Sequence, residues 1–96
     1  MATREQLDLV KRVILETRRN TIVWKEEEGK LSALAILDYI GSQRKIKVVL
    51  LKKEEEPHYK MVLNFVENSA RDLFGVNCSE YKELGRFGSY MFGVGL

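Results

Sequence analysis

The chain has 96 residues, of which 45% are hydrophobic and 31% are charged, and its formal net charge at pH 7 is +2. This length allows one hydrophobic core but not two, so we expect a single domain over residues 1–96. The composition excludes a disordered, collagenous or low-complexity chain. A net charge this small gives no argument for a polyanionic partner, although a local basic patch stays open.

Cysteine usage and hydropathy limit the compartment and the cofactors. Cys78 is the only cysteine, which excludes an intramolecular disulfide and a cysteine-rich zinc site. The N-terminal segment is charged and lacks the apolar stretch of a signal peptide. No apolar run reaches the roughly 18 residues of a membrane-spanning helix. We therefore expect a soluble, cytoplasmic protein that binds no membrane, metal or cofactor.

Residues 4–18 are predicted to form the first helix. Thr3 and Gln6 have the spacing of a capping box, which satisfies backbone amides at a helix start. Arg18 and Arg19 suit the negative end of the helix dipole. The apolar face of this helix is formed, at helical spacing, by Leu7, Val10, Val13, Ile14 and Thr17.

After Asn20, β-branched and aromatic residues predict a strand over Thr21–Trp24. Glu26–Lys30 is predicted to be a polar turn, with Gly29 at the position that needs a positive φ. The apolar block Leu31–Lys52 then indicates a β-hairpin. Its first arm, residues 32–39, could instead be a short helix, because alanine and leucine also favour helices and periodicity does not separate the two in so short a run.

Taking Gly41-Ser42 as a two-residue hairpin turn pairs Ile40 with Gln43, Asp38 with Lys45 and Ala33 with Leu50. This register creates two unlike faces. One face holds Ala33, Ala35, Leu37, Ile46, Val48 and Leu50, and its small alanines are expected to admit the helices. The other face holds Leu34, Ile36, Ile40 and Val49. That second face is more apolar than a solvated antiparallel sheet should be, so we expect another protein or a second copy of the chain to cover it.

The remaining sequence predicts a second helix and two further strands. The helix is expected over residues 57–74, beginning at Pro57 and ending at Gly75. Its apolar face would be Val62, Phe65, Val66, Ala70, Leu73 and Phe74. Two short strands are expected in residues 77–96, around a turn near Gly85. The predicted fold is therefore α+β, in the order α-β-β-β-α-β-β, with two helices packed on one face of a mostly antiparallel sheet.

The sequence contains no convincing catalytic set, so we expect a protein without enzymatic activity. His58 is the only histidine, and a small hydrolase using it with a carboxylate is the least favoured alternative. The glutamate runs 26–28 and 54–56 are interpreted as solvated turn charges that prevent edge-to-edge sheet association. Consecutive carboxylates point in different directions, which makes a cation site the poorer interpretation.

Two interaction hypotheses remain. The first is a small binding or adaptor module that acts through protein–protein contacts, as a dimer or assembly subunit, with Leu34, Ile36, Ile40 and Val49 at the interface. The alternative is a nucleic-acid-binding protein, whose contacts would be Arg44, Lys45, Lys47, Arg86, Phe87 and Tyr90. Residues 85–88 also match the G-x-x-G loop that clamps backbone nucleotides in KH domains. Glycine and aromatic residues at such a place are more often turn and packing residues.

Overall fold

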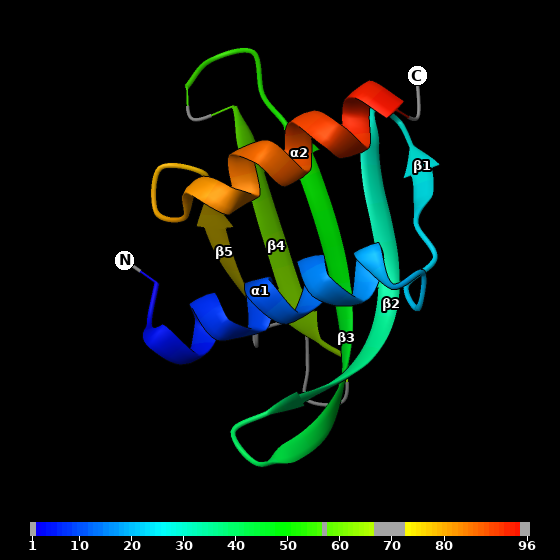
Figure 1. Cartoon of the computed structure of the whole chain (residues 1–96), viewed down its shortest axis with the longest axis vertical. Helices are drawn as coiled ribbons and strands as arrows, with labels where there is room; N and C mark the ends of the chain where they lie inside the picture. The colour runs from blue at the N-terminus through cyan, green and yellow to red at the C-terminus, as the bar shows by residue number, and fades with distance from the viewer. Residues whose placement is uncertain (1, 57, 67–72, 95–96) are drawn as a thin grey trace.

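The computed structural model describes residues 2–56, 58–66 and 73–94. Five antiparallel strands form one sheet in the order β1-β2-β3-β4-β5, with a helix before them and a helix after them (Figure 1). The α+β class is confirmed, but the predicted order of elements is wrong. The elements are α1 (Arg4–Arg18), β1 (Lys25–Glu27), β2 (Lys30–Tyr39), β3 (Ser42–Lys52), β4 (Tyr59–Phe65), β5 (Leu73–Asn77) and α2 (Lys82–Val94).

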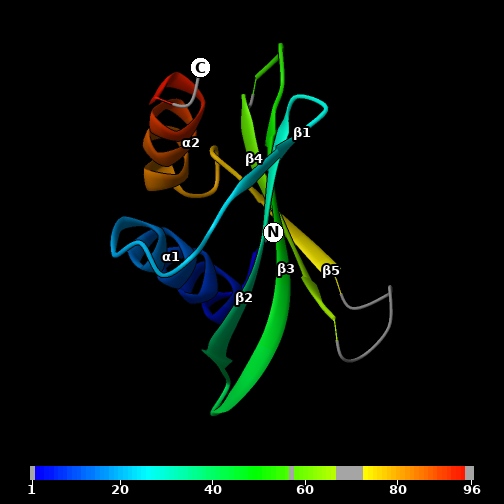
Figure 2. The same cartoon turned by 90° about the vertical axis from the view of Figure 1, so that its right-hand side faces the viewer.

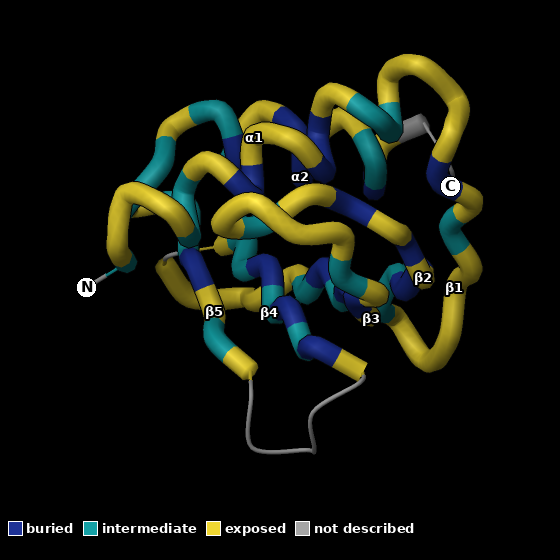
Figure 3. The backbone as a smooth tube through the Cα atoms, turned by 90° about the horizontal axis from the view of Figure 1, so that it is seen from below, coloured by how far each residue is buried: buried dark blue, intermediate teal, exposed yellow. Residues whose placement is uncertain are grey.

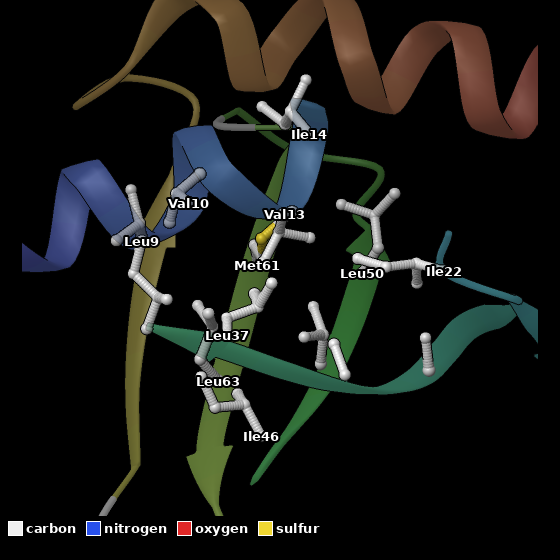
Figure 4. Close-up of a cluster of buried hydrophobic side chains, with 14 of the residues drawn as sticks. Leu9, Val10, Val13, Ile14, Ile22, Leu37, Ile46, Leu50, Met61 and Leu63 are labelled. Atoms are coloured by element: carbon white, nitrogen blue, oxygen red, sulfur yellow. The ribbon is translucent and has the colours of Figure 1, made fainter. Parts of the chain in front are cut away.

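Both helices lie on the same side of the sheet, and no helix of the described residues covers its other side (Figure 2). Buried and exposed residues alternate along the strands, because successive side chains point to opposite faces (Figure 3). The buried side chains gather between the sheet and the helices (Figure 4). The fully buried members with the largest volumes are Phe87, Ile46, Leu50, Met61, Leu63 and Leu84.

Helix α1 has the predicted bounds and the predicted cap. The backbone N–H of Gln6 donates to Thr3 Oγ1 at 3.1 Å, and that of Thr3 donates to Gln6 Oε1 at 2.9 Å. At the other end, Asn20 has a φ of 61° and turns the chain away from the helix axis. Asparagine tolerates this left-handed conformation better than most residues, which explains why the helix ends there.

The first strand was predicted in the wrong place. Residues 21–24 lie outside the sheet, and β1 follows them. Ile22 is buried in the core, and the indole Nε1–H of Trp24 donates to Thr17 Oγ1 at 3.0 Å. These residues therefore pack against the helical layer instead of pairing with a strand. The following turn is Glu28-Gly29, and the predicted positive φ of Gly29 is confirmed at 79°.

The hairpin is confirmed, and the alternative of a helix over residues 32–39 is wrong. Its turn is Ile40-Gly41, with positive φ values of 48° and 78° as in a type I′ turn, so Tyr39 pairs with Ser42. The predicted pairs are therefore wrong by two residues: Asp38 faces Gln43, not Lys45. A shift of two residues conserves the face of every side chain, which is why the predicted division into two faces nevertheless holds.

The second half of the chain exchanges strand and helix relative to the prediction. Residues 59–65 form β4, in which Met61, Leu63 and Phe65 are buried at alternate positions. The segment carries two signals, the helical spacing of Val62, Phe65 and Val66 and the alternation of Met61, Leu63 and Phe65, and pairing with β3 favours the strand. Leu73 and Phe74 begin β5, whereas Pro57 and Ala70 of the predicted helix lie outside the described residues.

The two predicted C-terminal strands are wrong, because residues 82–94 form α2. Leu84, Phe87 and Phe92 are buried at helical spacing. The glycines that suggested turns are helical residues, and one of them allows a close approach to β4. The four residues of the G-x-x-G match lie inside this helix, so they form no loop that could clamp a nucleotide.

Candidate functional site

The side of the sheet that faces away from both helices is the candidate interaction surface, and we call it the open face. The register and the alternation of the strands define it. Its residues are Lys25 and Glu27 of β1, Lys30, Ser32, Leu34, Ile36 and Asp38 of β2, Gln43, Lys45, Lys47, Val49 and Leu51 of β3, Lys60, Val62 and Asn64 of β4, and Leu73, Gly75 and Asn77 of β5.

Apolar side chains on the open face are exposed to an unusual degree. Leu34 is 58% exposed, Ile36 66% and Leu73 54%. Val49 and Val62 are partly exposed and face each other across β3 and β4. Exposed apolar groups that gather on one surface, rather than lying singly, mark sites of interaction. Three of the four predicted interface residues, Leu34, Ile36 and Val49, lie on this surface.

The fourth predicted interface residue, Ile40, lies elsewhere. It occupies the hairpin turn and is 73% exposed at the protruding end of β2 and β3 (Figure 1). The assumption of a Gly41-Ser42 turn placed it in the strand. The structure moves the turn by one residue and so removes Ile40 from the open face.

Lysines lie among the apolar residues of the open face. Lys45 and Lys47 of the central strand β3 stand beside Ile36 and Leu34 of β2. Lys25, Lys30 and Lys60 come from β1, β2 and β4. The described acidic residues on the same face are Glu27 and Asp38. The open face is therefore positively charged, although the whole chain is nearly neutral. Sequence analysis missed Lys25 and Lys60 because it placed no strand at either position.

The six residues predicted to contact nucleic acid do not form one surface. Lys45 and Lys47 lie on the open face, whereas Arg86 and Tyr90 are exposed on α2, in the other layer. Phe87 is only 2% exposed and belongs to the core, so it offers no ring to a base. Arg44 points to the helical side, where its guanidinium carbon lies 4.4 Å from the centroid of the Phe65 ring.

The outer edge of β2 is a second notable feature. β1 pairs with β2 only over Lys30–Ser32, so in the described part of the chain no strand pairs with the outer edge of residues 33–39. Three adjoining hollows follow this edge. They are lined by Val23, Lys25, Glu27 and Lys47 near β1, by Glu16, Thr21, Ile22 and Lys45 in the middle, and by Glu5, Asp8, Arg12 and Ile40 near the turn.

His58 offers little support for catalysis. Its Nδ1 lies 3.4 Å from the carbonyl oxygen of Lys53, and its Nε2 lies 3.8 Å from a carboxylate oxygen of Glu56. The fold brings Cys78 and Ser79 to the same hollow. Neither side chain hydrogen-bonds to His58 among the described residues, so the geometry assembles no activated nucleophile. The described residues also contain no cluster of three histidine, cysteine or acidic side chains that could hold a metal.

Two glutamates, Glu16 and Glu80, have pKa values that are lowered by hydrogen bonds within the fold. Hydrogen bonding from the Thr21 hydroxyl, together with nearby Arg12 and Arg19, lowers the pKa of Glu16. The backbone N–H groups of Ala2 and Asn77 lower the pKa of Glu80. Both shifts favour the charged carboxylate, as expected for groups that tie segments of the fold together.

Among the described residues, neither helix has the length and the apolar character needed to cross a lipid bilayer. No protein-family model, curated protein or solved structure matches the chain significantly. Inference of function therefore depends on the surfaces of the molecule itself.

Proposed function

We propose that the protein is a non-enzymatic binding module, acting as an adaptor or assembly subunit, whose open face docks on an acidic surface of a partner protein. The observation that carries this proposal is a sheet face turned away from both described helices, with Leu34, Ile36 and Leu73 more than half exposed on it. Antiparallel sheets that face water on one side normally show polar residues there. This one carries exposed apolar side chains on β2 and β5, on either side of the lysines of β3.

Energetics favour a partner that covers several of these side chains together. Burying one leucine or isoleucine fully yields about 1.5–3 kcal/mol. Association costs about 4–15 kcal/mol in lost translational and rotational freedom, so a few apolar contacts alone would give weak binding. The lysines on the same face supply the further attraction and the orientation, and they favour acidic partners over neutral ones.

The same charges argue against stacking two copies of the chain face to face. Such an arrangement would bring Lys45, Lys47 and Lys60 of each copy close to the same residues of the other. Like charges brought together across an interface cost about several kcal/mol, which other contacts between the two copies would have to offset. A different, acidic protein is therefore the better occupant of the open face.

A matched pair of charge substitutions tests the proposal. Leu73→Glu places a carboxylate on the open face, and Tyr90→Glu places the same group on α2, where Tyr90 is 60% exposed. Immobilised wild-type chain and the Tyr90→Glu variant should retain the same stoichiometric partner from a cell extract, and Leu73→Glu should lose it. The proposal would be rejected if Leu73→Glu retained the same proteins as the wild type.

The lysines also support a second candidate, binding of nucleic acid across the open face. Lys25, Lys45, Lys47 and Lys60 would contact phosphates, and the affinity would fall steeply with salt. Titration of a labelled oligonucleotide at low salt tests this, with Lys47→Glu expected to weaken binding and Arg86→Glu, on the other layer, expected to have little effect. Absence of binding at low salt would exclude this candidate.

A further inference from the structure

The outer edge of β2 carries an inference that goes beyond the proposed function, because it concerns a different surface. We infer that a second copy of this chain pairs its own β2 with this edge, antiparallel and about a two-fold axis, to join the two sheets. The pairing uses residues 34–40 of both copies. Figure 2 views the molecule from this side, where β1 crosses one end of β2 and the end toward the hairpin is uncovered.

The backbone N–H and C=O groups at this edge of β2 are oriented to hydrogen-bond with another strand. In a two-residue hairpin the flanking residues, here Tyr39 and Ser42, exchange backbone hydrogen bonds, and hydrogen-bonded pairs recur at every second residue. The N–H and C=O groups of Leu34, Ile36 and Asp38 therefore point away from β3. Since β1 ends its pairing at Ser32, no strand among the described residues meets these groups.

This edge lacks the usual protection against strand pairing. Natural edge strands are short, bulged or interrupted by proline and lysine. Residues 33–39 of β2 form a regular stretch with no proline or lysine, and Asp38 is their only charged residue. Leu34 and Ile36, both more than half exposed, stand beside the outward backbone groups. An edge of this kind is a template for another strand.

The position of β1 fixes the register of the pairing. A partner strand that passed beyond residue 33 would meet β1, so the available stretch begins at Leu34 and ends at the turn residue Ile40. Symmetric use of this stretch places the two-fold axis at Leu37. Ile36 of one copy then faces Asp38 of the second, and Leu34 faces Ile40 of the second. The register brings together outward-pointing backbone groups from both strands.

The charges along the edge identify a second copy as the occupant. Near β1 the edge is lined by two lysines, Lys25 and Lys47, against one carboxylate, Glu27. Near the turn the open side of the edge carries the carboxylate of Asp38, whereas Glu5, Asp8 and Arg12 of α1 lie on the helical side. Antiparallel pairing about a two-fold axis keeps the open faces of both copies on the same side, so the Asp38 end of each copy lies toward the lysine end of the other. The surface is thus complementary to itself, as an isologous interface requires.

This arrangement also gives Ile40 a role. A β-branched residue with a φ of 48° is strained and is normally replaced by asparagine, aspartate or glycine in such a turn. Strain of this sort persists at places where it serves an interaction. In the inferred dimer, Ile40 ends the pairing opposite Leu34 of the second copy, where its exposed apolar side chain would lose contact with water, which favours isoleucine over asparagine.

Sedimentation equilibrium of the full chain with two substitutions at one position tests the inference. Asp38→Pro removes the outward N–H and the carboxylate, whereas Asp38→Ala removes only the carboxylate. The wild type should show twice the 11.1 kDa mass of the chain at high concentration and dissociate on dilution. Asp38→Ala should weaken the dimer several-fold, and Asp38→Pro should abolish it. A dimer that survives Asp38→Pro overturns the inference, as does a wild type that stays monomeric at its highest soluble concentration.

Hydrogen exchange of the wild type keeps the inference testable if Asp38→Pro does not fold, as judged by circular dichroism. The amides of Leu34, Ile36 and Asp38 should exchange more slowly as the protein concentration rises. Concentration-independent exchange at all three overturns the inference. The Leu73→Glu variant separates this site from the open face, since it should lose the acidic partner and still form the dimer.

Discussion

Gly88 of α2 lies directly against the side chain of Tyr59 on β4. A Cβ atom at position 88 would come within 2.9 Å of Tyr59 Cβ and closer still to the ring. The same ring is stacked with Phe92, one turn further along the helix, with 6.0 Å between the centroids. The distance between α2 and the sheet is therefore set by the missing side chain of one glycine.

We predict that Gly88→Ala destabilises the protein although alanine is the better helix former. The added methyl group must displace the Tyr59 ring or the whole helix, and overpacking of this kind costs about 1–3 kcal/mol. Urea denaturation followed by circular dichroism measures the change. Gly93→Ala is the matched control, because no atom of the described residues lies within 4 Å of a Cβ at that position. It should stabilise the helix by about 0.5–1 kcal/mol, and equal effects of the two substitutions would contradict the packing argument.

The same glycine explains why sequence analysis missed α2. Glycine disfavours a helix on propensity, so Gly85 and Gly88 beside aromatic residues were interpreted as turns. The competing signal was present, since Leu84, Phe87 and Phe92 recur at helical spacing. Tertiary packing decides between the two signals. A single sequence does not reveal that the Tyr59 ring of β4 occupies the place that a side chain at position 88 would take.

A second prediction concerns the strained hairpin turn. Ile40→Asn should stabilise the chain by about 1 kcal/mol, because asparagine adopts the left-handed conformation at a lower cost than isoleucine. Thermal unfolding at high dilution, where the dimer inferred above is dissociated, isolates this effect. Glu28→Asn, at the equivalent position of the other turn with the same φ of 48°, is the control and should give a smaller gain since glutamate is not β-branched. A loss of stability in Ile40→Asn would show that the isoleucine makes an intramolecular contact that outweighs its strain.

The hairpin shows which part of a sheet surface can be predicted from sequence. Leu34, Ile36 and Val49 were placed on the correct face because side-chain alternation survives an error of two residues in register. Lys60, Val62 and Leu73 were missed, because residues 57–74 also match a helical period. The free edge of β2 was missed for another reason: it depends on where β1 stops, and the short exposed Lys25–Glu27 strand has no apolar pattern.

A third prediction uses the carboxylate of Glu80, which accepts hydrogen bonds from the backbone N–H groups of Ala2 at 2.8 Å and Asn77 at 3.3 Å. These bonds lower the pKa of Glu80 in the folded state. A lowered pKa contributes stability that is present above the pKa of the unfolded chain and lost as the pH falls through the pKa of the folded chain. Glu80→Gln should therefore be less stable than the wild type at neutral pH.

The difference between Glu80→Gln and the wild type should begin to shrink when the pH falls below about 4, the ordinary range of a glutamate pKa. It should disappear below the lowered pKa of Glu80 in the folded chain. Urea denaturation at a series of pH values measures it. Glu5→Gln, on the exposed surface of α1, controls for the change in net charge. A difference that stayed constant down to the lowest pH would mean that Glu80 acts through packing rather than through its charge.

The last prediction connects stability with the open face. Asn64 lies there between Lys47 and Leu73 on neighbouring strands, and its Oδ1 atom is buried without a hydrogen-bond partner among the described residues. A buried, unpaired polar atom costs about 1–3 kcal/mol. Asn64→Val should therefore raise the free energy of unfolding by about 1 kcal/mol, since valine also suits a strand.

Gln43→Val is the matched control, because Gln43 lies on the same face of β3 but is exposed. It introduces the same side chain without removing a buried oxygen, and its gain should be smaller. If both variants gained equally, strand propensity alone would account for the effect. Asn64→Val can also be tested for retention of the partner protein that Leu73→Glu loses. If Asn64→Val is more stable than Gln43→Val but retains less of that partner, the open face keeps a polar atom for binding at a cost in stability.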